Sequence, residues 1–318
     1  MPEEAPLIGT AAAPVPVGGK AEWFTGADGV RLRAALFPAD CHSLGSVVVS
    51  PGRTEPIEKY FETAQDLTSR GFTTLVHDWR GQGLSHRHLA DRLWGHADGY
   101  KDFLADYQNL LDTFEPRLPR PWIALGHSMG GCLTLLALAN GERRFCAAIL
   151  SAPMLGLSTG ATPRLAARAL ARILSSVGRG GTPIQKAGAE PAPFTANVLT
   201  HDRCRYERNE AQIEACPDLA LGPPTWGWLD FAFSAIGFLE RGPGTPQIGI
   251  PVTILAAGDD SVVDNAGLGR VAARLPQGRL VEVPGAFHEI LQETDEVRTI
   301  FWREFDAIVQ RCRPAAAP

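Results

Sequence analysis

The sequence lacks the cysteine and histidine patterns of a metal site or a disulfide scaffold. Its six cysteines form no Cys-x-x-Cys pair, and its eight histidines do not cluster at ligand spacing. In a chain of 318 residues this argues against a zinc site and against a fold held by disulfides. We therefore predict reduced, mostly buried thiols, of which Cys204 and Cys216 could pair only in an oxidising compartment. We expect no metal and no cofactor.

The sequence also lacks a secretion signal and a long apolar run. Its first residues are acidic where a signal peptide is basic, and no stretch approaches the roughly 18 apolar residues that a membrane span needs. The net charge of −5 provides no overall field to attract nucleic acid or an anionic membrane. We predict a cytoplasmic protein without a nucleic-acid partner. Transient, peripheral contact with a membrane would require a local patch.

What the sequence does contain is an alternation of short apolar runs with helical stretches. A turn at 27–29 joins two alternating segments between Glu22 and Phe37. The later runs are apolar on both faces, as strands of a parallel sheet must be when helices cover both sides. These runs are 46–50, 73–77, 122–125, 146–151, 252–256 and 280–283. We predict an α/β fold with a doubly wound, mostly parallel sheet.

The predicted core is interrupted once. We expect residues 1–20, rich in Ala, Pro and Gly, to be a flexible lead-in, and 21–152 with 248–318 to form the core. The segment 153–247 contains helical pieces but no credible buried parallel strand. We predict that it is a helical cap inserted into the core.

The candidate nucleophile lies in the pentapeptide Gly126-His127-Ser128-Met129-Gly130. The pattern G-x-S-x-G alone is a weak signal, but here it directly follows the predicted strand 122–125 and opens a helix. Such a tight turn needs small neighbours, and it projects the serine hydroxyl above a helix N-terminus that favours developing negative charge. The alternative is a serine in an ordinary glycine-rich turn. We predict that Ser128 is a nucleophile.

A serine nucleophile needs a base, and the base needs an orienting acid. In α/β-hydrolases these follow the serine in the order acid, then histidine, each in a loop after a later strand. Only His288 combines such a loop with a position downstream of the other two members. Asp259, Asp260 and Asp264 compete for the acid role, and the spacing favours Asp260, just past the strand end.

The chain resembles the lysophospholipase and monoacylglycerol-lipase group of α/β-hydrolases over nearly its whole length. Besides the serine pentapeptide, the matching core segments are 48–55, 78–85, 258–265 and 285–289. The predicted cap also matches, in Leu199-Thr200-His201-Asp202, Arg205-Tyr206, Arg208-Asn209 and 222–226. The cap match is more specific than the catalytic residues, because many chemistries share such a triad.

This resemblance implies the reaction and the oxyanion hole. It implies hydrolysis of carboxylic esters of monoacyl lipids, lysophospholipid or monoacylglycerol, through an acyl-enzyme on Ser128. It places the backbone N–H groups of Arg53 and Met129 around the oxyanion, and gives Asp78 a turn-holding role. The chain departs from many relatives in having Ser50-Pro51 where they carry histidine. Hydrogen bonds made by that histidine must be absent or replaced.

Two features of the predicted cap remain open to two interpretations. Its aromatic residues could pack the cap on the core or line an acyl-chain tunnel, and we take Trp226, Trp228 and Phe231 as candidate substrate contacts. The crowded aromatic residues are Trp226, Trp228, Phe231, Phe233 and Phe238. On another helix, arginines repeat opposite an apolar face, which indicates a solvated face or contact with lipid headgroups. These arginines are Arg164, Arg168 and Arg172.

Two other functions compete with the lipase hypothesis. A carboxylesterase or thioesterase on small soluble esters would show a different preference for acyl-chain length. A non-catalytic ligand-binding or sensing homologue would keep the fold without turnover, and the intact triad argues against it. Dehalogenase chemistry is disfavoured because its nucleophile would be an aspartate at position 128.

Overall fold

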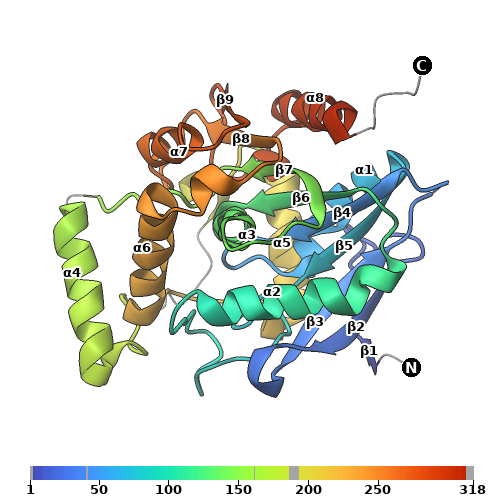
Figure 1. Ribbon diagram of the computed structural model, residues 1–318. Helices are drawn as coiled ribbons and strands as arrows, with labels where there is room; N and C mark the ends of the chain where they lie inside the picture. The colour runs from blue at the N-terminus through green and yellow to red at the C-terminus, as the bar shows by residue number, and fades with distance from the viewer. Residues whose placement is uncertain (1–2, 41, 161, 186–192, 313–318) are drawn as a thin grey trace.

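The computed structural model describes residues 3–40, 42–160, 162–185 and 193–312 (Figure 1). Within these residues one nine-stranded sheet forms, in the order β1-β2-β3-β5-β4-β6-β7-β8-β9. The strands are β1 (Glu3–Ala5), β2 (Lys20–Thr25), β3 (Arg31–Phe37), β4 (Gly45–Ser50), β5 (Phe72–His77), β6 (Trp122–His127), β7 (Phe145–Ser151), β8 (Val252–Ala257) and β9 (Gly278–Val283). In this order, adjacent strands from β5 through β4 to β9 pair in parallel, whereas the pairs β1–β2, β2–β3 and β3–β5 are antiparallel. The predicted mostly parallel sheet is confirmed.

Helices cover both faces of the central strands, which explains why β4, β5, β6, β7 and β8 are buried on both sides, whereas β9, predicted from the run 280–283, lies at the sheet edge and is largely exposed. The helices are α1 (Phe61–Ser69), α2 (Lys101–Phe114), α3 (Ser128–Ala139), α4 (Arg164–Leu174), α5 (Arg203–Ala215), α6 (Trp226–Arg241), α7 (Asn265–Ala272) and α8 (Asp295–Cys312). In β4, Val48 joins the apolar cluster under α2 and α3. Its neighbours Val47 and Val49 join the cluster under α1 and α8. All three are fully buried.

The N-terminal lead-in makes contacts that its composition did not indicate. Its first described residues form β1, which pairs with β2 at the edge of the sheet. The Ile8 amide donates to Glu58 Oε1 at 3.1 Å, and the buried Arg33 donates to the Pro6 carbonyl at 2.9 Å. These bonds join the segment to distant residues, which is why its lack of local periodicity did not reveal them.

The insertion between β7 and β8 is helical in its described part, where α4, α5 and α6 are its α-helices. α6 packs against α3, and α4 packs on the outer side of α6, at the edge of the molecule (Figure 1). We retain 153–247 as the proposed extent of the cap; its residues 186–192 lie outside the described residues.

One pair of cysteines contradicts the expectation of reduced thiols. Cys146 in β7 and Cys312 at the end of α8 form a disulfide, with their Cα atoms 5.6 Å apart. They are 166 residues apart in the chain and meet only because α8 packs on β7. The free cysteines among the described residues are Cys132, Cys204 and Cys216. Cys41 lies outside the described residues.

Candidate active site

The predicted nucleophile lies on a strained turn between β6 and α3. Ser128 has a φ of 48°, which is unusual for a residue with a side chain and is tolerated only where the surroundings enforce it. At Gly130 a Cβ atom would lie 2.0 Å from the Ser50 carbonyl oxygen, so only glycine lets this turn approach the loop after β4. The serine hydroxyl is thereby presented at the carboxyl edge of the sheet.

The structure brings the predicted base and acid to this hydroxyl. His288 Nε2 lies 3.0 Å from Ser128 Oγ, and His288 Nδ1 lies 2.7 Å from Asp260 Oδ2. Asp260 follows β8 and His288 follows β9, so three loops at one edge of the sheet meet here. Asp264 instead caps α7 by accepting from the Ala266 amide at 3.0 Å, and Asp259 is exposed.

The environment of Asp260 keeps it ionised. Burial by itself raises the pKa of this carboxyl, but the hydrogen bond to His288 and the amides of Val263 and Val262 outweigh it, so the pKa lies below its usual value. These amides donate to Asp260 Oδ1 at 2.9 and 2.8 Å. The other oxygen is left to accept the Nδ1–H of His288, which leaves Nε2 unprotonated and able to take the proton of Ser128.

The loop after β4 orients the amide of Arg53. Gly52 N donates to Glu55 Oε2 at 2.5 Å, and Thr54 N donates to Gln82 Oε1 at 3.1 Å. Thr54 has a φ of 68°, which sets the turn. Between these two anchored amides, the Arg53 N–H has no acceptor in the part of the chain that the structure describes.

The second predicted oxyanion donor, Met129, follows the nucleophile in the first turn of α3. Amides in the first turn of a helix have no intrahelical acceptor and can bind an anion. Arg53, Ser128 and Met129 all line the same cavity. The arrangement suits an oxyanion hole made of two backbone donors, as the resemblance implied.

A buried charge cluster beside the nucleophile was missed in the sequence. Lys59 Nζ lies 2.5 Å from Glu289 Oε1 and 3.1 Å from Glu55 Oε1. Burial raises the pKa of Glu55, but Lys59, His127 and hydrogen bonds outweigh it and bring it to about 2. The cluster links the oxyanion loop to the residue after His288. The i,i+4 spacing of Glu55 and Lys59 was the available sequence signal.

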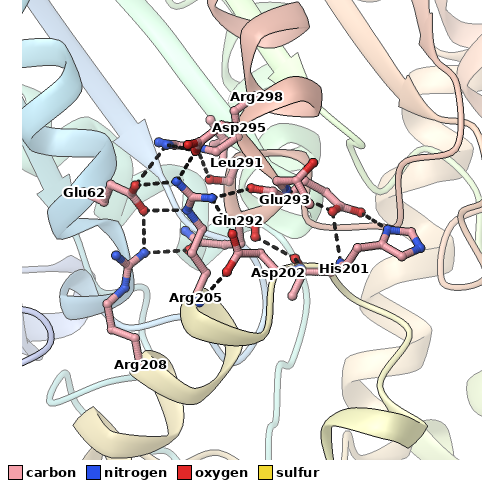
Figure 2. A network of polar contacts seen from close by, with 12 residues as sticks. Glu62, His201, Asp202, Arg205, Arg208, Leu291, Gln292, Glu293, Asp295 and Arg298 are labelled. Atoms are coloured by element: carbon pink, nitrogen blue, oxygen red, sulfur yellow. Dashed lines mark hydrogen bonds and ion pairs between the residues drawn. The ribbon is translucent and has the colours of Figure 1, made fainter.

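Of the cap segments that match, the one between 199 and 209 lies where α5 meets the loop that carries His288 (Figure 2). The fully buried Glu293 accepts from the amide of Phe287, the residue before His288, at 2.8 Å, and its Oε1 lies 2.8 Å from His201 Nδ1. Arg205 of α5 donates to the Glu293 carbonyl at 2.9 Å. These cap residues therefore hold the backbone next to His288, the predicted base.

Within the same network, the carboxylate of Glu62 also ties the cap to the core. Glu62 of α1 accepts hydrogen bonds from Arg205 and Arg208 of α5 and from Arg298 of α8 (Figure 2). Burial raises the pKa of Glu62, but these arginines outweigh it and bring it to about 2. The carboxylate therefore stays charged across the range in which a histidine base operates.

A cavity of about 400 Å³ opens above Ser128. Of the three aromatic residues proposed as substrate contacts, Trp228 lines it, whereas Trp226 does not. Phe231 points into the core and stacks on Phe103 with ring centres 5.1 Å apart. Trp226 and Trp228 lie about 200° apart around the helix, so both cannot face one cavity. Apolar lining residues that the sequence did not reveal are Met154, Leu157, Leu229, Val262 and Val263.

A serine on a strand-to-helix turn, with its histidine and aspartate at the same sheet edge, defines the α/β-hydrolase class. A family model described as serine aminopeptidase, S33 matches residues 42–295. The chain belongs to this family.

Curated relatives and solved structures agree with this assignment. Lysophospholipase L2 of Escherichia coli is 36% identical over 290 residues, covering 87% of this chain and 83% of that protein. Monoacylglycerol lipase of Mycolicibacterium smegmatis is 26% identical over 285 residues, covering 86% and 91% of the two chains. A soluble variant of monoglyceride lipase from Saccharomyces cerevisiae superposes with a TM-score of 0.75 at 19% identity, over 98% of this chain and 100% of its own. The predicted family resemblance and fold are confirmed.

Proposed function

We propose that the protein hydrolyses carboxylic esters of monoacyl lipids with Ser128, His288 and Asp260 as its catalytic triad. The observation that carries this proposal is the continuous hydrogen-bonded chain from Asp260 through His288 to Ser128, at 2.7 and 3.0 Å. The cavity above it has apolar walls that suit an acyl chain. The relatives named lysophospholipase and monoacylglycerol lipase support the same class of substrate.

The geometry supports a two-step acyl transfer. His288 Nε2 takes the Ser128 proton as Oγ attacks the ester carbonyl, and the amides of Arg53 and Met129 stabilise the tetrahedral oxyanion. His288 then protonates the leaving alcohol, which leaves an acyl-enzyme on Ser128. A water molecule activated by His288 releases the fatty acid. A phosphate ester in the headgroup remains intact, because these steps act on the acyl carbonyl.

Substrate preference should follow the length of the acyl chain. Each CH₂ removed from water contributes about 0.8 kcal/mol, so kcat/KM for nitrophenyl esters is expected to rise from acetyl to medium or long acyl groups. Trp228→Ala should flatten this rise while acetyl ester hydrolysis changes little, because Trp228 lines the cavity. Trp226→Ala is the matched control and should keep the full slope.

Two results would contradict this proposal. Equal flattening by Trp226→Ala would mean that the cavity above Ser128 does not hold the acyl chain. Best activity on acetyl or propionyl esters, with none on monoacyl lipids, would instead identify a small-ester carboxylesterase. Fatty acid release from lysophospholipid and monoacylglycerol measures this directly.

The exposed apolar residues of helix α4 support contact with a membrane surface. The sequence had indicated such contact through the arginines of this helix instead. Its small residues Ala167 and Ala171 are buried, while larger apolar residues on and just beyond the helix are exposed. These exposed residues are Leu165, Leu170, Ile173 and, just beyond the helix, Val177. No helix among the described residues has the length and apolarity to cross a bilayer. We propose that this face rests on the lipid surface from which substrate is taken, with Arg168 and Arg172 flanking it.

This proposal predicts weaker vesicle binding when the face is made polar. The double variant Leu170→Ser with Ile173→Ser should bind phosphatidylglycerol vesicles at least about tenfold more weakly in sedimentation assays, because two apolar side chains no longer leave water. Leu280→Ser is the matched control, because Leu280 is 44% exposed and Leu170 is 45% exposed. Equal vesicle affinity of the double variant and the wild type would overturn the membrane proposal.

A further inference from the structure

Among the described residues, no carboxylate binds the side chain of Arg53, a cation in the proposed substrate cavity. It lines the cavity with Ser128, and its guanidinium carbon lies 5.4 Å from the centre of the Trp228 ring. One Nη group donates to the carbonyl of Gly222. The Nε atom is enclosed and has no hydrogen-bond partner in the described parts of the chain. The guanidinium also packs on Gly95, where a Cβ atom would lie 2.6 Å from Nη2.

Three other enclosed arginines have more partners than Arg53, whereas Arg274, which does not line this cavity, also has an Nε without a partner among the described residues and one Nη group that donates to a carbonyl. Arg33 and Arg80 are both buried, and carboxylates bind each of them. Arg87 has no carboxylate within hydrogen-bond distance among the described residues, but its Nη groups donate to five backbone carbonyls. Burial lowers the pKa of Arg53 to about 10, so it remains charged at neutral pH. Enclosing a charge with so few partners is unfavourable unless a ligand supplies the missing ones.

The carboxylates that line the cavity do not supply the missing partners of Arg53. Glu55 and Glu289 line the same cavity, but both bind Lys59. The second oxygen of Glu55 is occupied by the Gly52 amide and the Tyr60 hydroxyl, at 2.5 and 2.6 Å. Both carboxylates thus bind Lys59 and not Arg53, and Arg53 retains donors for an anion that enters with the substrate.

We propose that the Arg53 guanidinium binds the phosphate of a lysophospholipid and so favours phosphate-bearing monoacyl lipids over neutral monoacylglycerols. Guanidinium groups bind phosphate oxygens in paired, charge-assisted hydrogen bonds. The number of bonds between the Arg53 amide and its guanidinium is comparable to that between the ester carbonyl and the phosphate across glycerol. A lipid whose carbonyl oxygen meets the Arg53 amide can therefore extend its phosphate toward the guanidinium. The inference rests on the proposed function, and it names the substrate class within it.

The test compares three lipids that carry the same acyl chain: lysophosphatidylglycerol, lysophosphatidylcholine and monoacylglycerol. Arg53→Met should lower the ratio of kcat/KM for each lysophospholipid to that for monoacylglycerol by on the order of 10- to 100-fold. Arg53→Lys should restore part of it, since it keeps the charge without the planar fork. The backbone N–H survives in both variants, and any disturbance of the oxyanion hole affects all three lipids and cancels in the ratio. An unchanged ratio in Arg53→Met would overturn the proposal.

A binding measurement separates this inference from the proposed function. Ether analogues, 1-alkylglycerophosphocholine and 1-alkylglycerol, cannot be hydrolysed and can compete with a soluble nitrophenyl ester. Arg53→Met should raise the inhibition constant of the phosphocholine ether by on the order of tenfold or more relative to that of the alkylglycerol. Leu229→Ala, an apolar change in the same cavity, should raise both constants by similar factors. If the enzyme cleaved nitrophenyl esters but no monoacyl lipid, the proposed function would fail, while the two constants would still report whether Arg53 binds phosphate. If Arg53→Met raised the inhibition constants of the two ether analogues by equal factors, binding of phosphate by Arg53 would be refuted.

Discussion

Ser128→Ala is expected to lower kcat for ester hydrolysis by about four to six orders of magnitude, because the triad acts as a unit once its nucleophile is removed. The change deletes only Oγ, whose partner is His288 Nε2 at 3.0 Å. The positive φ at this position is equally unfavourable for alanine and serine, so the thermal unfolding midpoint should change little. Steady-state hydrolysis and a melting curve on the same preparation provide both measurements.

Covalent labelling gives the control for this variant. A fluorophosphonate probe should modify the wild type at Ser128 and should no longer label Ser128→Ala. Ser261→Ala, which removes another hydroxyl from the same cavity, should still be labelled. Labelling that persists in Ser128→Ala would show that a different residue is the nucleophile.

Asp260→Asn is expected to lower kcat by on the order of 10³- to 10⁴-fold. The amide oxygen can still accept from the amides of Val262 and Val263, so the loop should keep its shape. The amide NH₂ would then face His288 Nδ1 and donate to it, which moves the imidazole proton to Nε2. In that tautomer the histidine cannot accept the Ser128 proton.

The neighbouring acids are the matched controls for this prediction. Asp264→Asn should change kcat little, because asparagine caps a helix about as well as aspartate and Asp264 serves α7. Asp259→Asn alters an exposed side chain and should also have a small effect. A severe loss in Asp264→Asn, with Asp260→Asn mild, would move the acid to position 264.

The sheet and the meeting of Ser128, Asp260 and His288 could be predicted because both depend on local patterns combined with one rule of topology. Runs such as β4 are apolar on both faces, which identifies strands covered from both sides. Since parallel strands end at one edge, the loops that carry Ser128, Asp260 and His288 were expected to meet there. Their distances of 2.7 and 3.0 Å agree with that expectation.

What could not be predicted depends on which surfaces meet in three dimensions. The pattern of α4 indicates an amphipathic helix but not which face is covered, and close contact with α6 favours the small Ala167 and Ala171. The aromatic content of α6 was visible, yet only packing shows that Phe231 faces Phe103 while Trp228 faces the cavity. The unpartnered Nε of Arg53 has no sequence signal, because a missing partner is a property of the folded surroundings.

The Cys146–Cys312 bond closes a covalent ring within the chain. The ring contains the cap, Asp260 and His288, whereas Ser128 lies on the segment that leads into it. A single backbone cleavage inside the ring, for instance in the cap, therefore nicks the enzyme without separating its parts, and Ser128 stays covalently joined to His288 and Asp260. If the disulfide of the nicked protein is then reduced, no covalent bond joins the two fragments. They are held together only by noncovalent packing of the sheet and its helices.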